Sequence, residues 1–234
     1  MSPPATAARS VLVTGTDTGI GKTHASVALL HALRGRGLRA VGMKPVASGC
    51  DWIDGHWRNE DALALQAASD PRPGYADINP FALPEPTAPV LAAREAGIGV
   101  ELGAILDAHA RLAAMADFVL VEGAGGWDAP LATDIEHHTL AQRIGGGVVL
   151  VVGLKLGCLS HARLSARAIA ADGCRLLGWI GNRIDPDFAR VDDYLALLEA
   201  ALPAPRLGVL PFAGDAATQT GEALALDPMW TDVP

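Results

Sequence analysis

The feature that most constrains this chain is a glycine-rich turn between an apolar strand and an amphipathic helix. The segment from Val11 to Leu30 reads VLVTGTDTGIGKTHASVALL. The first N–H groups of a helix lack partners within it, and glycines let the preceding turn aim further N–H groups at the same point. The combination predicts a phosphate-binding loop, in which the Lys22 ammonium reaches the β- and γ-phosphates and the Thr23 hydroxyl can ligate Mg²⁺.

The loop is a variant of the usual phosphate-binding pattern. In G-x-x-x-x-G-K-[ST], four residues separate the two glycines. Here Thr16 stands where the first glycine is expected, and five residues lie between Gly15 and Gly21. The strand before the turn and the helix after it still favour a phosphate cradle.

Apolar strand-like runs alternate with longer helix-like segments along the chain. The runs are residues 10–14, 39–43, 118–121, 148–153, 176–181 and 206–210, and the helix-like segments are residues 23–36, 102–115, 161–172 and 187–202. Repeated β-α-β order predicts a parallel sheet covered on both faces. We therefore expect an α/β, single-domain P-loop NTPase fold over residues 1–234, with residues 1–9 as a disordered tail. Residues 50–89 are rich in Pro, Gly, Asp and Trp, and are expected to form an elaborate loop over the site with one helix at residues 59–68.

Charge and hydropathy exclude several classes of protein. The formal net charge of −8 has the wrong sign for binding nucleic-acid phosphates. The N-terminal segment lacks the apolar run of a secretion signal, and no segment offers the 18 uninterrupted apolar residues of a membrane span. Three widely spaced cysteines suit free thiols in a reducing compartment. These features predict a cytoplasmic enzyme without nucleic-acid or membrane partners.

Charged and polar side chains recur where the predicted strands end. Lys44, Glu122, Lys155 and Asn182 follow four of the strands, and Pro211 follows the last. Ligands of doubly wound sheets collect outside the carboxyl ends of the strands, so these groups are expected to share one edge. Two lysines beyond Lys22 indicate a second anion beside the γ-phosphate, and hence phosphoryl transfer to an oxyanion.

The neighbours of these groups refine the prediction. Pro45 is expected to keep the Lys44 ammonium from being buried in the sheet. Glu122, followed by Gly123 and Gly125, is interpreted as a metal-associated carboxylate, and Asp61 as a further candidate oxygen ligand. The adjacent residues 137 and 138, both histidine, are interpreted as part of an exposed loop rather than a metal site.

Several segments together resemble the dethiobiotin synthetase family. They are TGTDTGIGKT, KPVASG, EDALAL, NPFALPEPTAP, LVEGAGGW, LVVGLKLGCLSHA and GWIGNRID, and they extend the resemblance from about Val11 to Pro211. The resemblance implies a cytoplasmic homodimer that uses ATP, Mg²⁺ and CO₂ on 7,8-diaminononanoate. In this family the diamine becomes a carbamate, the carbamate takes the γ-phosphoryl group as a carbamic-phosphoric anhydride, and ring closure gives dethiobiotin with release of ADP and phosphate.

The resemblance also assigns roles to residues. It implies that Lys44 and Lys22 are catalytic and that Thr23, Asp61 and Glu122 hold the metal. The residues expected at the nucleotide are Gly19, Ile20, Gly21, Lys22, Thr23, His24, Asp61, Glu122, Gly123, Ala124, Gly125, Asn182, Arg183, Pro211, Phe212 and Ala213. Those expected at the diamine are Thr18, Ser48, Lys155, Ser160 and Tyr194, with Ser160 capping a helix that starts at His161 to bind the distal carboxylate.

One departure and two alternatives accompany the resemblance. Many members of the family carry an acid where this chain has Gly19. The chief alternative is a P-loop switch ATPase of the partitioning or septum-positioning kind, but such proteins typically carry a second lysine in the loop, where this chain has Thr16, Asp17 and Thr18. The other is an amide-forming synthetase of the cobyrinate type, which ordinarily brings a glutaminase domain for which this chain has no room.

Overall fold

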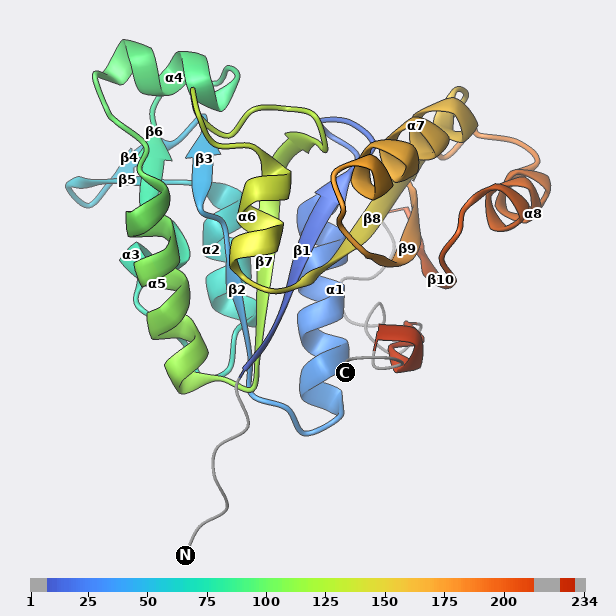
Figure 1. Ribbon diagram of the computed structural model, residues 1–234, viewed down its shortest axis with the longest axis horizontal. Helices are drawn as coiled ribbons and strands as arrows, with labels where there is room; N and C mark the ends of the chain where they lie inside the picture. Colours follow the sequence, from blue (N-terminus) through green and yellow to red (C-terminus); the bar gives the residue numbers. More distant parts are fainter. Residues whose placement is uncertain (1–7, 213–223, 230–234) are drawn as a thin grey trace, which may run out of the picture.

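A six-stranded parallel sheet forms the centre of the molecule. The computed structural model describes residues 8–212 and 224–229, and the strands lie in the order β10-β9-β8-β1-β7-β2, with all adjacent pairs parallel (Figure 1). The strands are β1 (Arg9–Gly15), β2 (Ala40–Met43), β7 (Phe118–Gly126), β8 (Gly147–Leu154), β9 (Leu176–Arg183) and β10 (Arg206–Leu210). All six predicted strands are confirmed, although β1 already begins at Arg9, inside the segment expected to be a tail.

The central residues of the strands are mostly apolar because helices bury both faces of the sheet. In β8, Val149 and Val151 belong to the core cluster beneath α1 (Lys22–Gly35) and α2 (Glu60–Ala68). The alternate residues Leu150 and Val152 belong to a cluster on the opposite face, beneath α7 (Cys158–Ala171) and α8 (Val191–Ala201). On that same face α5 (Leu102–Met115) and α6 (His137–Arg143) cover β7 (Figure 1). The period-2 geometry of a strand thus assigns successive side chains to different cores.

The region expected to be a loop with one helix contains more regular structure. The predicted helix is confirmed as α2, and its N-cap Asn59 accepts a hydrogen bond from the Ala62 N–H. The additional elements within it are the hairpin of β4 (Asp51–Ile53) and β5 (His56–Arg58), α3 (Tyr75–Ile78) and β6 (Phe81–Leu83). Just before the region, β3 (Val46–Ser48) pairs in parallel with β6, and α4 (Pro89–Ala96) begins at the last residue of the region. Strands of three residues are too short to show a hydrophobic period, so the sequence pattern could not reveal them.

Two helices begin at other residues than predicted. The helix expected from residue 161 begins at Cys158, because Gly157 makes the turn with a φ of 96°. The helix expected from residue 187 begins at Val191, after Arg190 with a φ of 61°. The remaining described element is the short 3₁₀ helix η1 (Asp227–Met229). Among the described residues, no helix has both the length and the apolar character needed to span a membrane.

Candidate functional site

The carboxyl ends of the strands bring most of the predicted site to one edge of the sheet. The phosphate-binding loop follows β1, Lys44 follows β2, Lys155 follows β8, and Asn182 is the penultimate residue of β9. Glu122 differs from the prediction because it lies within β7, in register with Val13, rather than after the strand. The strand continues past it to Gly126, which pairs with Gly15 next to the loop.

The loop after β1 has the backbone shape that its glycines predict. Gly19 and Gly21 adopt positive φ angles of 72° and 79°, and Gly21 is the N-cap of α1. The Lys22 ammonium folds back onto the loop and donates to the carbonyl oxygen of Asp17 at 2.9 Å. Burial, with repulsion from Lys44, lowers the pKa of Lys22 to about 8. A polyanion would restore the ammonium's preference for its charged form.

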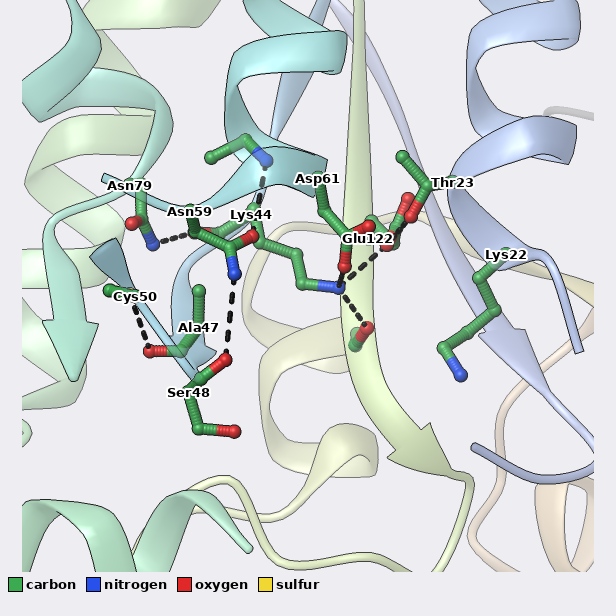
Figure 2. Close-up of polar contacts among 12 residues, drawn as sticks. Lys22, Thr23, Lys44, Ala47, Ser48, Cys50, Asn59, Asp61, Asn79 and Glu122 are labelled. Atoms are coloured by element: carbon green, nitrogen blue, oxygen red, sulfur yellow. Dashed lines mark hydrogen bonds and ion pairs between the residues drawn. The ribbon is translucent and has the colours of Figure 1, made fainter. Parts of the chain in front are cut away.

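Lys44 lies buried between two carboxylates. Its ammonium donates to Glu122 Oε1 at 2.6 Å, to Asp61 Oδ2 at 2.9 Å and to the Gly123 carbonyl at 3.4 Å (Figure 2). Burial alone lowers the pKa of Lys44, but the attraction of Glu122 and Asp61 outweighs it and raises the pKa. The expectation that Pro45 keeps this ammonium out of the interior is wrong: only 5% of Lys44 is exposed, because the carboxylates compensate its charge.

The three predicted metal ligands converge around that ammonium. The Thr23 hydroxyl donates to Glu122 Oε1 at 2.9 Å, so Thr23 and Lys44 share one carboxylate oxygen (Figure 2). The other oxygen of Glu122 is buried and has no hydrogen-bond partner within the described part of the chain. Burial by itself raises the pKa of Asp61. The opposing effect of Lys44 and the Thr23 hydroxyl is larger, so the pKa of Asp61 is lowered overall.

This oxygen set suits magnesium. Two carboxylates and a hydroxyl are hard ligands of the kind that hold Mg²⁺ together with substrate phosphates. Among residues 8–212 and 224–229 no group of three or more His, Cys, Asp or Glu is arranged to hold a metal. The residues present therefore fit an ion that arrives with a nucleotide rather than a protein-only cage.

Asn182 joins β9 to the phosphate-binding loop. Its amide nitrogen donates to the Ile20 carbonyl at 2.8 Å, and a Cβ atom at Gly21 would collide with this amide. Its amide oxygen is buried and has no partner among the residues described. This oxygen could accept a hydrogen bond from an N–H group of a nucleotide base. Arg183 and the two residues after β10, Pro211 and Phe212, are exposed, whereas Ala213 lies outside the described residues.

Other predicted substrate contacts lie around the loop. The Lys155 ammonium pairs with Asp17 Oδ2 at 3.2 Å, and the Thr18 N–H donates to the other oxygen of Asp17 at 2.8 Å. That N–H lowers the pKa of Asp17, and Lys155 contributes. Ser48 ends β3, close to the N-terminus of α2, where its carbonyl faces the Asn59 amide at 3.5 Å.

Ser160 and Tyr194 are not brought to Lys44 within this chain. Ser160 lies in the first turn of α7 and is not its N-cap, which corrects the expected capping role; Gly157 is the N-cap, and its carbonyl accepts from the His161 N–H. Tyr194 lies on α8 and packs edge-on against Phe188, with 4.7 Å between ring centroids. Both helices lie near β8 and β9, far from β2 and Lys44 in the sheet order (Figure 1).

Sequence reasoning missed one buried side chain and one buried network. His137 has no exposed surface, so its interpretation as an exposed loop residue is wrong; burial lowers its pKa to about 4, and its ring abuts Gly123. Asn79 and Tyr75 contact the backbone at Lys44 and Asn59. The Asn79-Pro80 pair signals a turn in the sequence, but nothing in the pattern shows which backbone it contacts.

Comparison with known proteins identifies close relatives. The AAA domain family matches residues 9–220. ATP-dependent dethiobiotin synthetase BioD of Xylella fastidiosa (strain 9a5c) is 62% identical over 199 residues, which cover 85% of this chain and 88% of that protein. The protein of the same name from Xanthomonas axonopodis pv. citri (strain 306) is 56% identical over 209 residues, covering 88% of this chain and 93% of that protein.

Solved structures share the fold at much lower identity. A ParA family ATPase from Chlorobium tepidum TLS has a TM-score of 0.55 at 16% identity, covering 93% of this chain and 89% of that one. The MinD cell division protein of Aquifex aeolicus has a TM-score of 0.54 at 17% identity, covering 94% and 88%. These similarities confirm the predicted P-loop α/β fold. At such low identity they carry no information on activity or substrate.

Proposed function

The chain belongs to the AAA domain family and, within it, to the ATP-dependent dethiobiotin synthetases, and from that premise we propose how its residues carry out the reaction. It is an ATP-dependent ligase of biotin biosynthesis. We propose that it joins CO₂ to 7,8-diaminononanoate and closes the ureido ring of dethiobiotin, with ADP and phosphate as the other products. The observation that carries this proposal is the buried Lys44 ammonium, held next to the phosphate-binding loop by two carboxylates.

The proposed reaction has three steps. One amine of the substrate attacks CO₂, forms an N–C bond and loses a proton, which leaves a carbamate anion. A carbamate oxygen then attacks the γ-phosphorus of ATP, and the bond from that phosphorus to the β–γ bridging oxygen breaks, so ADP leaves. The second amine attacks the carbonyl carbon of the carbamic-phosphoric anhydride, the bond to the phosphate oxygen breaks, and the amine's proton is lost as the ring closes.

Two lysines serve the anions of these steps in our proposal. Lys22 binds the terminal phosphates, because it belongs to the loop whose N–H groups surround that position. Lys44 is placed to bind the carbamate oxygen and the transferring phosphoryl group, where charge develops. Its three present partners are all oxygens of the protein, so the site already holds an ammonium in a polyanionic setting.

Thr23, Asp61 and Glu122 would hold Mg²⁺. When bound, the ion would neutralise charge on the β- and γ-phosphates. The partnerless oxygen of Glu122 and the hard donor set support this assignment. Lys44 contacts both of these carboxylates, so the ammonium and a divalent ion would compete for the same oxygens.

We also propose that the enzyme is a cytoplasmic homodimer of single-domain subunits. Ser160 and Tyr194 lie on the α7–α8 flank, away from Lys44 in their own chain. A role for either at the substrate carboxylate therefore requires a second subunit. Asn182 would bind the base through its partnerless amide oxygen, beside Arg183 and the segment that follows β10.

Labelled bicarbonate tests the proposed function directly. Purified enzyme is incubated with ¹⁴C-bicarbonate, ATP, Mg²⁺ and 7,8-diaminononanoate, and the products are separated by chromatography. We expect label in a cyclic urea, one ADP per labelled product, and no labelled product from Lys44→Ala. Arg206→Ala, which removes a cation at the far edge strand β10, is the matched control and should keep activity. Hydrolysis of ATP without labelled urea would overturn the proposal.

A further inference from the structure

The last residue of α3, Ile78, and its C-cap, Asn79, both hydrogen-bond to the backbone of Lys44. The Lys44 N–H donates to the Ile78 carbonyl at 2.8 Å. The Lys44 carbonyl accepts from the side-chain amide of Asn79 at 2.7 Å (Figure 2). The same amide nitrogen also faces the Phe81 carbonyl at 3.3 Å. Because two carbonyls face the nitrogen, the amide oxygen of Asn79 must point the other way.

Tyr75 connects that oxygen to the start of α2. The Tyr75 hydroxyl donates to Asn79 Oδ1 at 3.0 Å and accepts from the Asn59 N–H at 2.8 Å. Asn59 is the N-cap of α2, and Asp61 lies two residues further along, with its carboxylate on the Lys44 ammonium at 2.9 Å. The contacts thus form a closed ring, which runs from the Lys44 carbonyl through Asn79, Tyr75 and α2 back to the Lys44 ammonium.

The two asparagines in this closed ring of contacts are shielded from solvent. Asn59 and Asn79 are buried, with 5% and 3% of their surface exposed. The Arg58 guanidinium lies 4.1 Å from the centre of the Tyr75 ring and covers it. Burial raises the pKa of Tyr75, so its hydroxyl keeps the proton that it donates to Asn79. Buried and satisfied hydrogen bonds of this kind hold their members in one arrangement.

We propose that Tyr75 and Asn79 are positioning residues, which set the Lys44 ammonium relative to Asp61 by fixing the Lys44 backbone to the N-terminus of α2. This inference rests on the proposed function for its effect on catalysis. Without the hydroxyl, the ion pair alone must set the spacing between the two elements, and a displacement of about 1 Å can cost about 100-fold in rate.

Ser69, the C-cap of α2, offers a matched control at the opposite end of that helix. Its hydroxyl accepts from the Gly42 N–H of β2 at 2.9 Å and donates to the Leu65 carbonyl of α2 at 2.7 Å. Ser69 is buried, with 7% of its surface exposed. Like Tyr75, it is a hydroxyl that makes two hydrogen bonds, but these join α2 directly to β2, and among the described residues its hydrogen bonds go to neither Lys44 nor Asp61.

The first experiment compares Tyr75→Phe with Ser69→Ala. Both variants lose one hydroxyl that makes two hydrogen bonds, so both should lower Tm. We expect Tyr75→Phe to reduce kcat at least about tenfold with KM for ATP changed less than about twofold, whereas Ser69→Ala keeps kcat within about twofold. Equal losses of kcat in both variants, or an unchanged kcat in Tyr75→Phe, would overturn the inference.

A second readout does not depend on turnover. Mn²⁺ binding to the protein saturated with a non-hydrolysable ATP analogue, followed by electron paramagnetic resonance, reports on the geometry of Asp61. We expect Tyr75→Phe to shift the Mn²⁺ Kd at least about threefold and Ser69→Ala to leave it unchanged. If the wild type makes no cyclic urea, the proposed function fails, but this measurement still decides the inference: equal Kd values in all three proteins overturn it.

Double substitution tests whether the two residues act in series. Asn79→Ala interrupts the same ring one contact later than Tyr75→Phe. We therefore expect the double variant to have a kcat within about twofold of Asn79→Ala alone, because residues that act as one unit are not additive. Fully multiplied losses would show independent roles and would overturn the inference.

Discussion

Lys44→Met separates the electrostatic role of this lysine from its size. The substitution keeps a chain of similar length but removes the charge that compensates Glu122, which has no exposed surface, and Asp61. Removing one partner of a buried ion pair typically costs about 3–5 kcal/mol, because the remaining charge stays uncompensated. For a domain of this size, each kcal/mol lowers Tm by about 2–4 °C, so we expect a fall of about 6–20 °C.

The matched control is Lys155→Met. The Lys155–Asp17 pair is 3.2 Å long, and 37% and 47% of the two side chains are exposed. Solvent screens such a pair, which contributes about 0–1 kcal/mol, so Tm should fall by at most about 4 °C. The two variants remove the same charge from the same residue type, and they differ chiefly in burial.

Magnesium should reverse much of the loss in the Lys44 variant. Its two carboxylates no longer hold an ammonium, so a divalent ion meets no competitor there. An ion at about 100 times its Kd stabilises the folded state by about 2.7 kcal/mol. Differential scanning calorimetry with and without Mg²⁺ measures both effects. The reasoning is refuted if the two lysine variants show the same Tm, or if Mg²⁺ raises Tm of Lys44→Met no more than that of the wild type.

Three further predictions concern the same edge of the sheet. Glu122→Gln should weaken Mg²⁺-dependent ATP binding at least about tenfold in calorimetric titrations; an unchanged metal titration contradicts a ligand role. Because the pKa of Lys22 is lowered to about 8 and phosphates favour its charged form, ATP affinity should fall as pH rises through about 8, with proton uptake on binding; Lys22→Arg should abolish this dependence, and a flat wild-type profile contradicts it. Gly123→Ala should lower stability by about 1–3 kcal/mol in urea unfolding, since its Cβ would collide with the His137 ring, whereas Gly103→Ala, with open space around it, should not; equal stabilities refute this packing argument.

The fold was predictable because its signals are local and repeated. Apolar runs such as residues 148–153 are buried on both faces, so each shows its strand character without reference to any partner. The solved neighbours with this fold include a ParA family ATPase and the MinD cell division protein. Their identity below 20% decides only the fold, and the synthetases at 56–62% identity decide the family.

Site residues were predictable where a charged or polar residue stands at the carboxyl end of a predicted strand. Lys44 and Asn182 are at the expected edge because parallel strands all end there. Ser160 was placed wrongly because the true cap, Gly157, depends on a backbone angle rather than on a capping side chain. The sequence pattern does not reveal the burial of His137, because that burial depends on packing against Gly123, a residue of another element.

The sequence by itself determined the phosphate-binding loop, the six strands of the sheet with the longer helices between them, and the family, because these depend on neighbouring residues and on long stretches of identity. Only the tertiary structure decided that Lys44 is buried between Asp61 and Glu122, and that Asn79 and Tyr75 fix its backbone. The physical reason is distance along the chain. These side chains come from separate elements, and their charges and hydrogen bonds compensate one another only after the sheet has brought them together.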